Sequence, residues 1–148
     1  MSLIAFRSGA NVLAYEKNNI KYGMVCAWAT MVDYSSVAML VGSQSVTGNN
    51  LKVGDIVGIS ALSSDQKNIS DLIGSSHSNE EDKFKNIKYH RKNQAILIDD
   101  AKVNLYCEVT KILHLDENSD DNFVVFKVIE HKCDDNKEFL PLEVALNR

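Results

Sequence analysis

Residues 103–110 alternate between apolar and polar side chains, and this alternation constrains the fold more than any other feature of the sequence. The apolar side chains are Val103, Leu105, Cys107 and Val109. Since successive side chains of a strand point to opposite faces of its sheet, the pattern predicts a strand with one buried and one solvated face. A second strand-like run, residues 123–129, follows an acidic connection. We expect the two runs to pair antiparallel.

Other runs with the length and composition of strands cover residues 12–15, 20–28, 37–41, 55–62 and 95–98. The first two are separated by residues 16–19, whose two asparagines tolerate the positive φ of a tight turn, so a hairpin is predicted. Residues 37–41 are apolar at every position. That run predicts a central strand that is covered on both faces.

Two short helices complete the expected set of elements. Thr47 is predicted to be the N-cap of a helix of one or two turns, with Val46 and Leu51 as a hydrophobic staple and Gly54 at the end. A second helix, apolar on one face, is expected to end at Gly74. Six or seven strands with mostly short links favour an antiparallel barrel or closed sheet, an all-β to α+β fold, over a doubly wound parallel fold.

Length and charge limit the possible functions. The 148 residues suit a single domain over residues 1–148, and the net charge of −4 gives no global positive field for nucleic acid. Neither a secretory leader nor an apolar run of about 20 residues is visible, so no membrane association is expected. The three cysteines are odd in number and form no Cys-x-x-Cys pair. Reduced thiols and a cytoplasmic location are therefore predicted.

The familiar signatures of catalysis are missing from the sequence. It contains no dinucleotide or Walker glycine motif, no His-Glu-x-x-His and no Gly-x-Ser-x-Gly. The four histidines lack ligand spacing, and residues 116–121 lack the pattern of a calcium loop, so no metal is expected and a solvated hairpin tip is predicted there. No catalytic residue can be named. In an enzyme of this kind, a cofactor would supply the reactive atoms.

The segment from Gly23 to Thr30 is the best candidate for a cofactor contact. Its small residues would let a flat aromatic ring approach the backbone, Trp28 offers an apolar wall, and Thr30 offers a hydroxyl. A simple core tryptophan is the alternative interpretation of Trp28. Ser43, Gln44 and Ser45 precede the helix that Thr47 is predicted to cap, so this corner could hold a phosphate, or the helix could be capped and bind nothing.

Residues 83–92 contain five basic side chains and no acidic one. A solvated basic face, a docking site for a nucleotide phosphate and a nucleic acid contact all fit this stretch. The negative net charge makes nucleic acid the least favoured of the three. A cofactor-free barrel that binds nucleic acid is kept as a third hypothesis.

An ordered set of segments resembles the flavin reductase-like FMN-binding split-barrel family. The matching segments are Gly23-Met24 with Ala27-Trp28-Ala29-Thr30, Ser43-Gln44-Ser45 with Thr47, Val53-Gly54-Asp55 with Val57, Asp82-Lys83-Phe84, Ala101, and Leu105-Tyr106-Cys107-Glu108-Val109. The resemblance extends over residues 9–131. The chain departs from the family pattern in two places: Tyr22 replaces a frequent asparagine, and Ser35-Ser36 replace a Pro-Pro pair.

The resemblance implies a six-stranded antiparallel split barrel with a few short helices, a homodimer, and FMN near the subunit interface. It implies cofactor contacts for Tyr22, Ala27, Trp28, Ala29, Thr30, Ser43, Gln44, Ser45, Thr47 and Lys83. The implied function is an FMN-binding oxidoreductase, a flavin reductase-like enzyme that takes hydride from NADH or NADPH. The alternative is an FMN-carrying electron-transfer protein with little reductase activity of its own, favoured by the short segment after the last strand.

Overall fold

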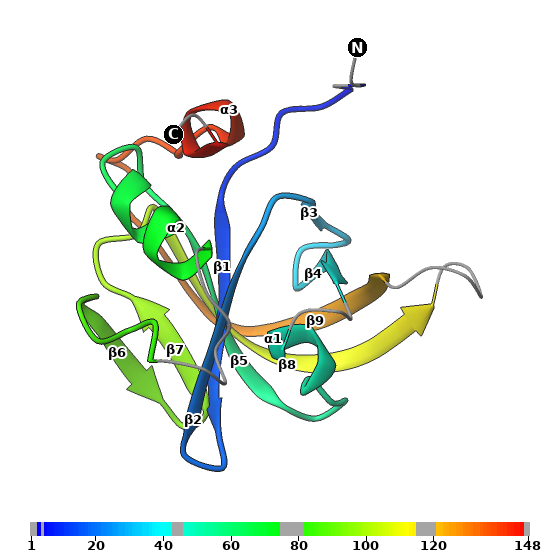
Figure 1. Ribbon diagram of the computed structural model, residues 1–148. Coiled ribbons are helices and arrows are strands. Elements are labelled where there is room, and N and C mark those ends of the chain that lie inside the picture. The colour runs from blue at the N-terminus through cyan, green and yellow to red at the C-terminus, as the bar shows by residue number, and fades with distance from the viewer. Residues whose placement is uncertain (1–2, 4, 43–45, 75–81, 115–120, 147–148) are drawn as a thin grey trace.

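The computed structural model describes residues 3, 5–42, 46–74, 82–114 and 121–146, and the description that follows is confined to them. These residues form nine strands and three short helices (Figure 1). The strands are β1 (Asn11–Lys17), β2 (Ile20–Cys26), β3 (Ala29–Met31), β4 (Ser36–Gly42), β5 (Ile56–Ala61), β6 (Tyr89–Lys92), β7 (Ala95–Ile98), β8 (Val103–His114) and β9 (Asp121–Cys133). The helices are α1 (Val46–Asn49), α2 (Lys67–Gly74) and α3 (Leu142–Leu146).

The predicted hairpins are confirmed. β1 and β2 pair antiparallel across a two-residue turn in which Asn18 and Asn19 have φ values of 53° and 66°. Asparagine adopts this left-handed conformation more readily than most residues, which explains the pair at the turn. β8 and β9 also pair antiparallel along most of their length, with irregularities between Tyr106 and Cys107 and between Val109 and Lys111. Such bulges bend the two long strands and so help the sheet to curve.

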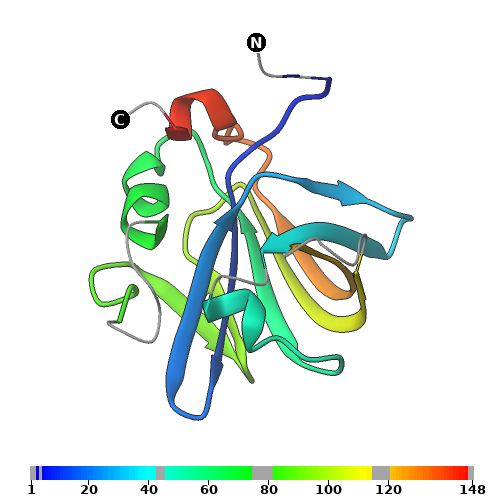
Figure 2. The same cartoon turned by 45° about the vertical axis from the view of Figure 1, so that its right-hand side comes forward.

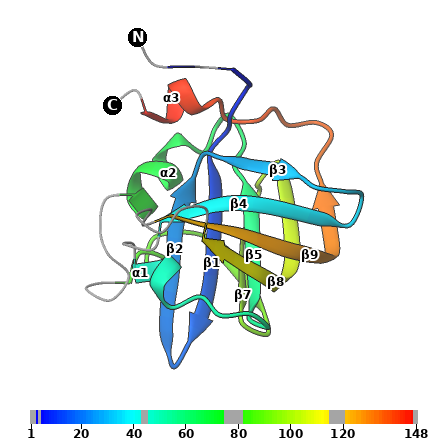
Figure 3. The same ribbon diagram turned by 90° about the vertical axis from the view of Figure 1, so that its right-hand side faces the viewer.

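All neighbouring strands pair antiparallel, in the order β3-β4-β9-β8-β5-β1-β7-β6. β2 lies off this path and pairs with β1. The strand over residues 37–41 was expected to be central, and β4 indeed lies between β3 and β9 (Figure 3). The antiparallel, barrel-like fold with a few short helices is therefore confirmed.

The strand count from sequence was too low. β3 has only three residues, all exposed, so it carries no alternation of buried and exposed side chains. β6 reads Tyr-His-Arg-Lys and is half-buried only at Tyr89, so it resembles a basic loop more than a strand. Both were missed because pairing, rather than local pattern, holds them in the sheet.

One connection in the fold determines where a site can form. β2 pairs with β1, whereas β3, which follows it after two residues, pairs with β4. The chain therefore crosses from one part of the sheet to another at Ala27 and Trp28. β2 and β4 run close to each other without forming a ladder of strand pairs. We call the place where the end of β2 meets β4 without such a ladder the split.

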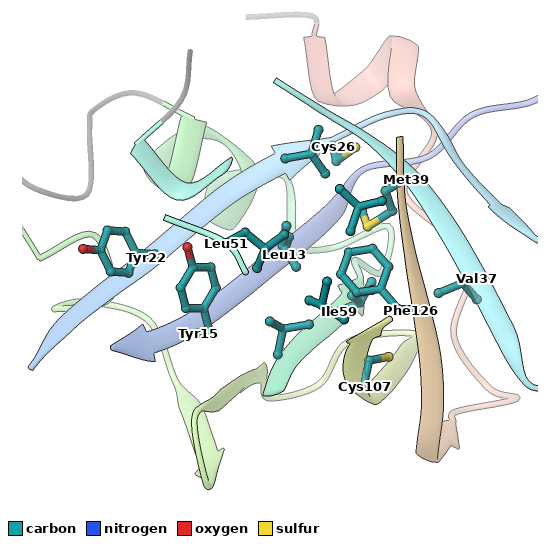
Figure 4. Packing of buried hydrophobic residues seen from close by; sticks show 14 residues of the cluster. Leu13, Tyr15, Tyr22, Cys26, Val37, Met39, Leu51, Ile59, Cys107 and Phe126 are labelled. Carbon is teal, nitrogen blue, oxygen red and sulfur yellow. The ribbon is translucent and has the colours of Figure 1, made fainter. Parts of the chain in front are cut away.

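The interior of the barrel is filled by a cluster of apolar side chains from β1, β2, β4, β5, β8 and β9 (Figure 4). Tyr15 and Tyr22 stack within it, with ring centroids 5.0 Å apart and planes at 23°. Phe126 and Met39 are fully buried on the facing strands. Burial of this much apolar surface is the main force that closes the sheet.

A second cluster lies on the other side of the β1–β2 hairpin, under α2 and α3 (Figure 2). Ile73 of α2 and Phe84 are buried there. Both face Gly23, where an added Cβ would lie 2.6 Å from Phe84 Cζ and 3.6 Å from Ile73 Cγ2. Gly23 is needed because no side chain fits between β2 and Phe84.

Helix α2 ends at Gly74 as predicted, but the first helix differs from its prediction. α1 begins at Val46 and ends at Asn49, so Thr47 lies inside it, buried, and is not its N-cap. Gly54 is not the end of this helix; it has a φ of 95° in the following turn and donates its N–H to the Val109 carbonyl. The turn conformation, rather than a helix end, requires the glycine.

None of the helices in the described part of the chain has the length and apolar character needed to cross a membrane.

Candidate functional site

An open hollow of about 220 Å³ lies at the split. The end of β2 and the crossing segment form one side of it, from Met24 to Trp28. Leu40 and Gly42 of β4 and Asp121, the first residue of β9, also line it. Among the described residues, the lining is mostly apolar and contains one carboxylate, that of Asp121. Ligand pockets commonly have this composition, in which a few polar groups orient a mainly apolar contact.

Three hydrogen bonds fix the walls of the hollow. The Leu40 N–H donates to the Trp28 carbonyl at 3.0 Å, and the Cys26 thiol donates to the Leu40 carbonyl at 3.0 Å. The Asn11 amide donates to the Cys26 carbonyl at 3.1 Å from β1. These bonds tie the crossing segment to β4 and to β1.

The exposed position of Trp28 excludes the alternative that it is a simple core tryptophan. Its side chain is 65% exposed and lines the hollow. A core tryptophan would have lost most of its contact with water. Met31, Val32 and Tyr34 continue the exposed apolar surface along β3 and into the next turn, with exposed fractions of 62%, 55% and 104%. We call this surface, from Trp28 to Tyr34, the β3 patch.

The predicted contact residues of the crossing segment divide into two groups. Ala27 and Trp28 line the hollow. Ala29 and Thr30 are exposed on β3, and the Thr30 hydroxyl donates to the Met31 carbonyl at 3.2 Å. The four residues are contiguous, so a flat ligand lying against Trp28 and extending out of the hollow would pass over Ala29 and Thr30.

Tyr22 occupies a different environment from the hollow-lining residues. It is 6% exposed and stacks on Tyr15 in the interior cluster (Figure 4). Tyr15 in turn donates its hydroxyl to the Thr47 carbonyl at 2.5 Å. Burial, the largest effect, and the nearby Asp55 carboxylate raise the pKa of Tyr15 well above its usual range, so the hydroxyl stays protonated as a donor. Tyr15, which stacks on Tyr22, therefore holds α1 through its hydrogen bond to the Thr47 carbonyl.

Lys83 is half-buried and donates to the Gly23 carbonyl at 2.9 Å. Lys83 therefore contacts β2 at Gly23, the residue just before Met24, where the strand begins to line the hollow. Ser43, Gln44 and Ser45, the predicted phosphate contacts, lie outside the described residues. Thr47, the fourth member of that corner, is buried in α1.

Two basic residues of the stretch 83–92 are paired with acids. Arg91 lies 2.6 Å from the Glu16 carboxylate, and Lys92 lies 2.6 Å from that of Glu130. Lys92 also lies 4.7 Å from the centre of the Tyr106 ring. Neither residue lines the hollow. These contacts support the interpretation of the stretch as a basic, solvated face.

Sequence reasoning missed Asp121. Residues 116–121 were expected to form a solvated hairpin tip, and residues 116–120 lie outside the described part of the chain. Asp121 itself is half-buried, pairs with Gly42 and lines the hollow. Asp121 was grouped with the acidic residues before it, although it is the first residue of β9. The only signal in the sequence that Asp121 belongs to a strand was its position five residues before Phe126, in the apolar run of β9.

The hollow contains one thiol, and its chemistry is that of a structural group. Burial raises the pKa of Cys26 to about 11; a hydrogen bond with the Trp28 backbone opposes this rise, and the charge of Asp121 adds to it. The thiolate, not the thiol, is the nucleophile, so Cys26 is unreactive at neutral pH. The site can therefore bind and orient a flat ligand, but its described residues provide no evident nucleophile.

The family model described as flavin reductase like domain matches residues 5–145. None of the curated proteins matches the sequence.

Three solved structures have closely similar folds. The NADH:FAD oxidoreductase SgcE6 of Streptomyces globisporus has a TM-score of 0.79 at 21% identity, over 90% of this chain and 80% of that one. A second structure of it is described as a complex with NAD and FAD fragments. The FMN-binding protein of Thermus thermophilus has a TM-score of 0.77 at 14% identity, over 88% and 74% of the two chains. Flavoredoxin of Methanosarcina acetivorans has a TM-score of 0.75 at 16% identity, over 90% and 73%.

The family match spans nearly the whole chain, and the neighbours share its antiparallel sheet and short helices. This protein belongs to the flavin reductase like domain family.

Proposed function

We propose that this protein binds FMN in the hollow at the split and catalyses flavin reductase-like hydride transfer from NADH or NADPH. The observation that carries the proposal is an exposed tryptophan beside small residues in a mostly apolar hollow. An aromatic ring stacked on Trp28 would find apolar contacts on both walls. A bound flavin would supply the electron-accepting atoms, which the described residues lack.

In this proposal the flavin ring lies against Ala27 and Trp28 and extends over Ala29 and Thr30. The phosphate lies toward the corner formed by Ser43, Gln44, Ser45 and Thr47, which follows Gly42 directly in the chain. Tyr22 and Lys83 act behind these contacts, through the Tyr15 stack and the Gly23 carbonyl.

We also propose that the working unit is a homodimer. The hollow is smaller than the roughly 300 Å³ at which ordinary ligand pockets begin, so it would hold a ring but not a whole mononucleotide. The β3 patch borders it and exposes four large apolar side chains, more than isolated surface residues would. A second copy packed on this patch would cover the patch and enclose the open side of the hollow.

A second candidate function is that of an FMN-carrying electron-transfer protein. It is favoured by the likeness to the Thermus thermophilus FMN-binding protein and to the Methanosarcina acetivorans flavoredoxin. For either function we place the protein in the cytoplasm as a single domain over residues 1–148, because its three cysteines are free thiols.

The test is a titration of the purified protein with FMN, FAD and riboflavin, followed by flavin fluorescence. We expect saturable binding, with FMN tighter than riboflavin because of its phosphate. Trp28→Ala should weaken binding about tenfold or more, since it removes an aromatic contact. Phe139→Ala, which removes an exposed aromatic side chain outside both the hollow and the β3 patch, is the matched control. A protein that binds no flavin would refute the proposal, and rapid bleaching of bound flavin by NADH or NADPH would favour the reductase over the carrier.

A further inference from the structure

The Cys26 thiol takes the place of a backbone donor at the point where the β3–β4 ladder ends. In the register of β3 and β4, Ala29 pairs with Met39, so Trp28 and Leu40 would form the next pair. The Leu40 N–H donates to the Trp28 carbonyl at 3.0 Å, as in a regular antiparallel pair. The reciprocal bond of such a pair would run from the Trp28 N–H to the Leu40 carbonyl. Here the Cys26 thiol donates to that carbonyl at 3.0 Å, and β3 begins only at Ala29.

Cys26 is the last residue of β2, and its carbonyl is held as well as its thiol (Figure 4). The side-chain amide of Asn11 on β1 donates to this carbonyl at 3.1 Å. The thiol also lies 3.8 Å from the Trp28 carbonyl. Because Cys26 is only 4% exposed, water competes little for the bonds of its thiol. The end of β2 is thus tied to β1 on one side and to Leu40 of β4 on the other.

The two residues that follow this attachment are the proposed contacts of the flavin ring. Ala27 and Trp28 belong to neither β2 nor β3, so no strand ladder fixes their backbone on both sides. Their position depends on the bonds that Cys26 and Leu40 make around them. A ring that stacks on Trp28 binds more tightly when this segment is already ordered, since less conformational freedom is lost on binding.

We propose that Cys26 is a positioning residue for the flavin. Its thiol, through the bond to the Leu40 carbonyl, sets the backbone of Ala27 and Trp28 so that the tryptophan ring stands as a wall of the hollow. The inference rests on the proposed function and extends it to a residue that acts through its neighbours. A thiol that is buried and unreactive at neutral pH suits this task, because it donates a hydrogen bond and stays neutral.

The test uses the fluorescence of Trp28, which is the only tryptophan in the sequence. Its anisotropy reports the mobility of this ring in the protein without flavin. Cys26→Ala removes the thiol donor, and Cys26→Ser keeps a donor of similar size. Cys107→Ala is the matched control, because it removes a buried thiol of the same interior cluster that is not among the described residues lining the hollow. The anisotropy, the dissociation constant of FMN and the stability to urea are measured for each protein.

Cys26→Ala is expected to lower the anisotropy of Trp28 and to raise the dissociation constant of FMN roughly threefold to tenfold, the effect of one hydrogen bond. Cys26→Ser should bind FMN within about twofold of wild type. Cys107→Ala should lose stability without a change in anisotropy or in FMN affinity. Asn11→Ala, which removes the bond to the Cys26 carbonyl, should also weaken FMN binding and serves as the test if Cys26→Ala does not fold.

Three results would count against these expectations. If Cys26→Ala bound FMN as tightly as wild type, or Cys26→Ser bound it as weakly as Cys26→Ala, the inference would be overturned while flavin binding stands. If Cys107→Ala weakened FMN binding as much as Cys26→Ala, the thiol of Cys26 would act only through general stability, and the inference would also be overturned. A wild type that binds no flavin would overturn the proposed function, and this inference with it.

Discussion

The ammonium group of Lys83 donates a hydrogen bond of 2.9 Å to the Gly23 carbonyl, on the strand that leads into the hollow. Its neighbours contact the same strand: Asp82 pairs with Lys21 at 3.1 Å, and the ring of Phe84 lies over Gly23. Residues 82–84, which are far from β2 in the sequence, thus all contact this strand. The position of Met24 to Trp28 depends on this attachment.

Replacing Lys83 by methionine should lower the free energy of unfolding by about 1–2 kcal/mol, because the Gly23 carbonyl loses a charged donor while the apolar stem is kept. Urea unfolding measures the change, with Lys85→Met, an exposed neighbour, as the control. Flavin affinity should fall less than it does in Trp28→Ala. If Lys83→Met abolished flavin binding at unchanged stability, Lys83 would instead contact the cofactor directly.

Gly23→Ala should destabilise the protein by about 1–3 kcal/mol, since the new Cβ overpacks the site. The new methyl group would lie 2.6 Å from Phe84 Cζ and 3.0 Å from Cε2, so the ring must shift. Combining Gly23→Ala with Phe84→Leu should cost less than the sum of the two single changes, because the smaller side chain makes room. Thermal unfolding of the wild type, the two single variants and the double variant provides this double-mutant cycle. Strictly additive changes in stability would argue against the contact between residue 23 and Phe84.

Alkaline solution should destabilise the protein through its buried thiols. Burial raises the pKa of Cys107 from 9.0 to about 12, and that of Cys26 to about 11. The unfolded chain therefore loses these protons first as the pH rises. The stability from the neutral thiols is complete below pH 9 and declines above it, by up to about 1.4 kcal/mol per pH unit for each thiol.

Cys107→Ala isolates one of these contributions. The variant should be less stable at every pH because it leaves a small cavity, but its stability should decline less steeply between pH 9 and pH 12. Urea unfolding at a series of pH values gives the slope. Equal slopes in wild type and variant would mean that the Cys107 thiol does not titrate on unfolding.

The proposed homodimer predicts that Met31→Glu shifts the protein toward monomer, because a charge would be buried in the β3 patch. Val53→Glu is matched to it, since both side chains are 62% exposed and Val53 lies outside the patch. Sedimentation velocity measures the oligomeric state, and flavin titration shows whether the second copy helps to form the site. A wild type that is monomeric at high concentration would contradict the homodimer.

The sequence predicted those parts of the fold that depend on local pattern. The hairpin of β1 and β2, the apolar β4 and the β8–β9 pair all have side chains whose spacing reflects burial. β3 could not be predicted, because its three residues are exposed and only their pairing with β4 makes them a strand. α1 was misplaced because Thr47 has the side chain of a cap but is held inside the helix, where Tyr15 binds its carbonyl.

For the site, the sequence led to the crossing segment but not to what faces it. Small residues beside a tryptophan were enough to suggest Ala27 and Trp28, and both line the hollow. Leu40, Gly42 and Asp121 come from strands that are brought there only by sheet topology, so no spacing in the sequence could relate them to Trp28.

The pairing of β1 has a consequence for how the protein folds. This one strand pairs with β2, β5 and β7, and only β2 is its neighbour in sequence. The β1–β2 hairpin can form early, since its turn closes a short loop. Its other two partners must be recruited from far along the chain, which is slow. Mutations in β1 should therefore alter the rate of refolding, whereas mutations in β3 should act mainly on unfolding.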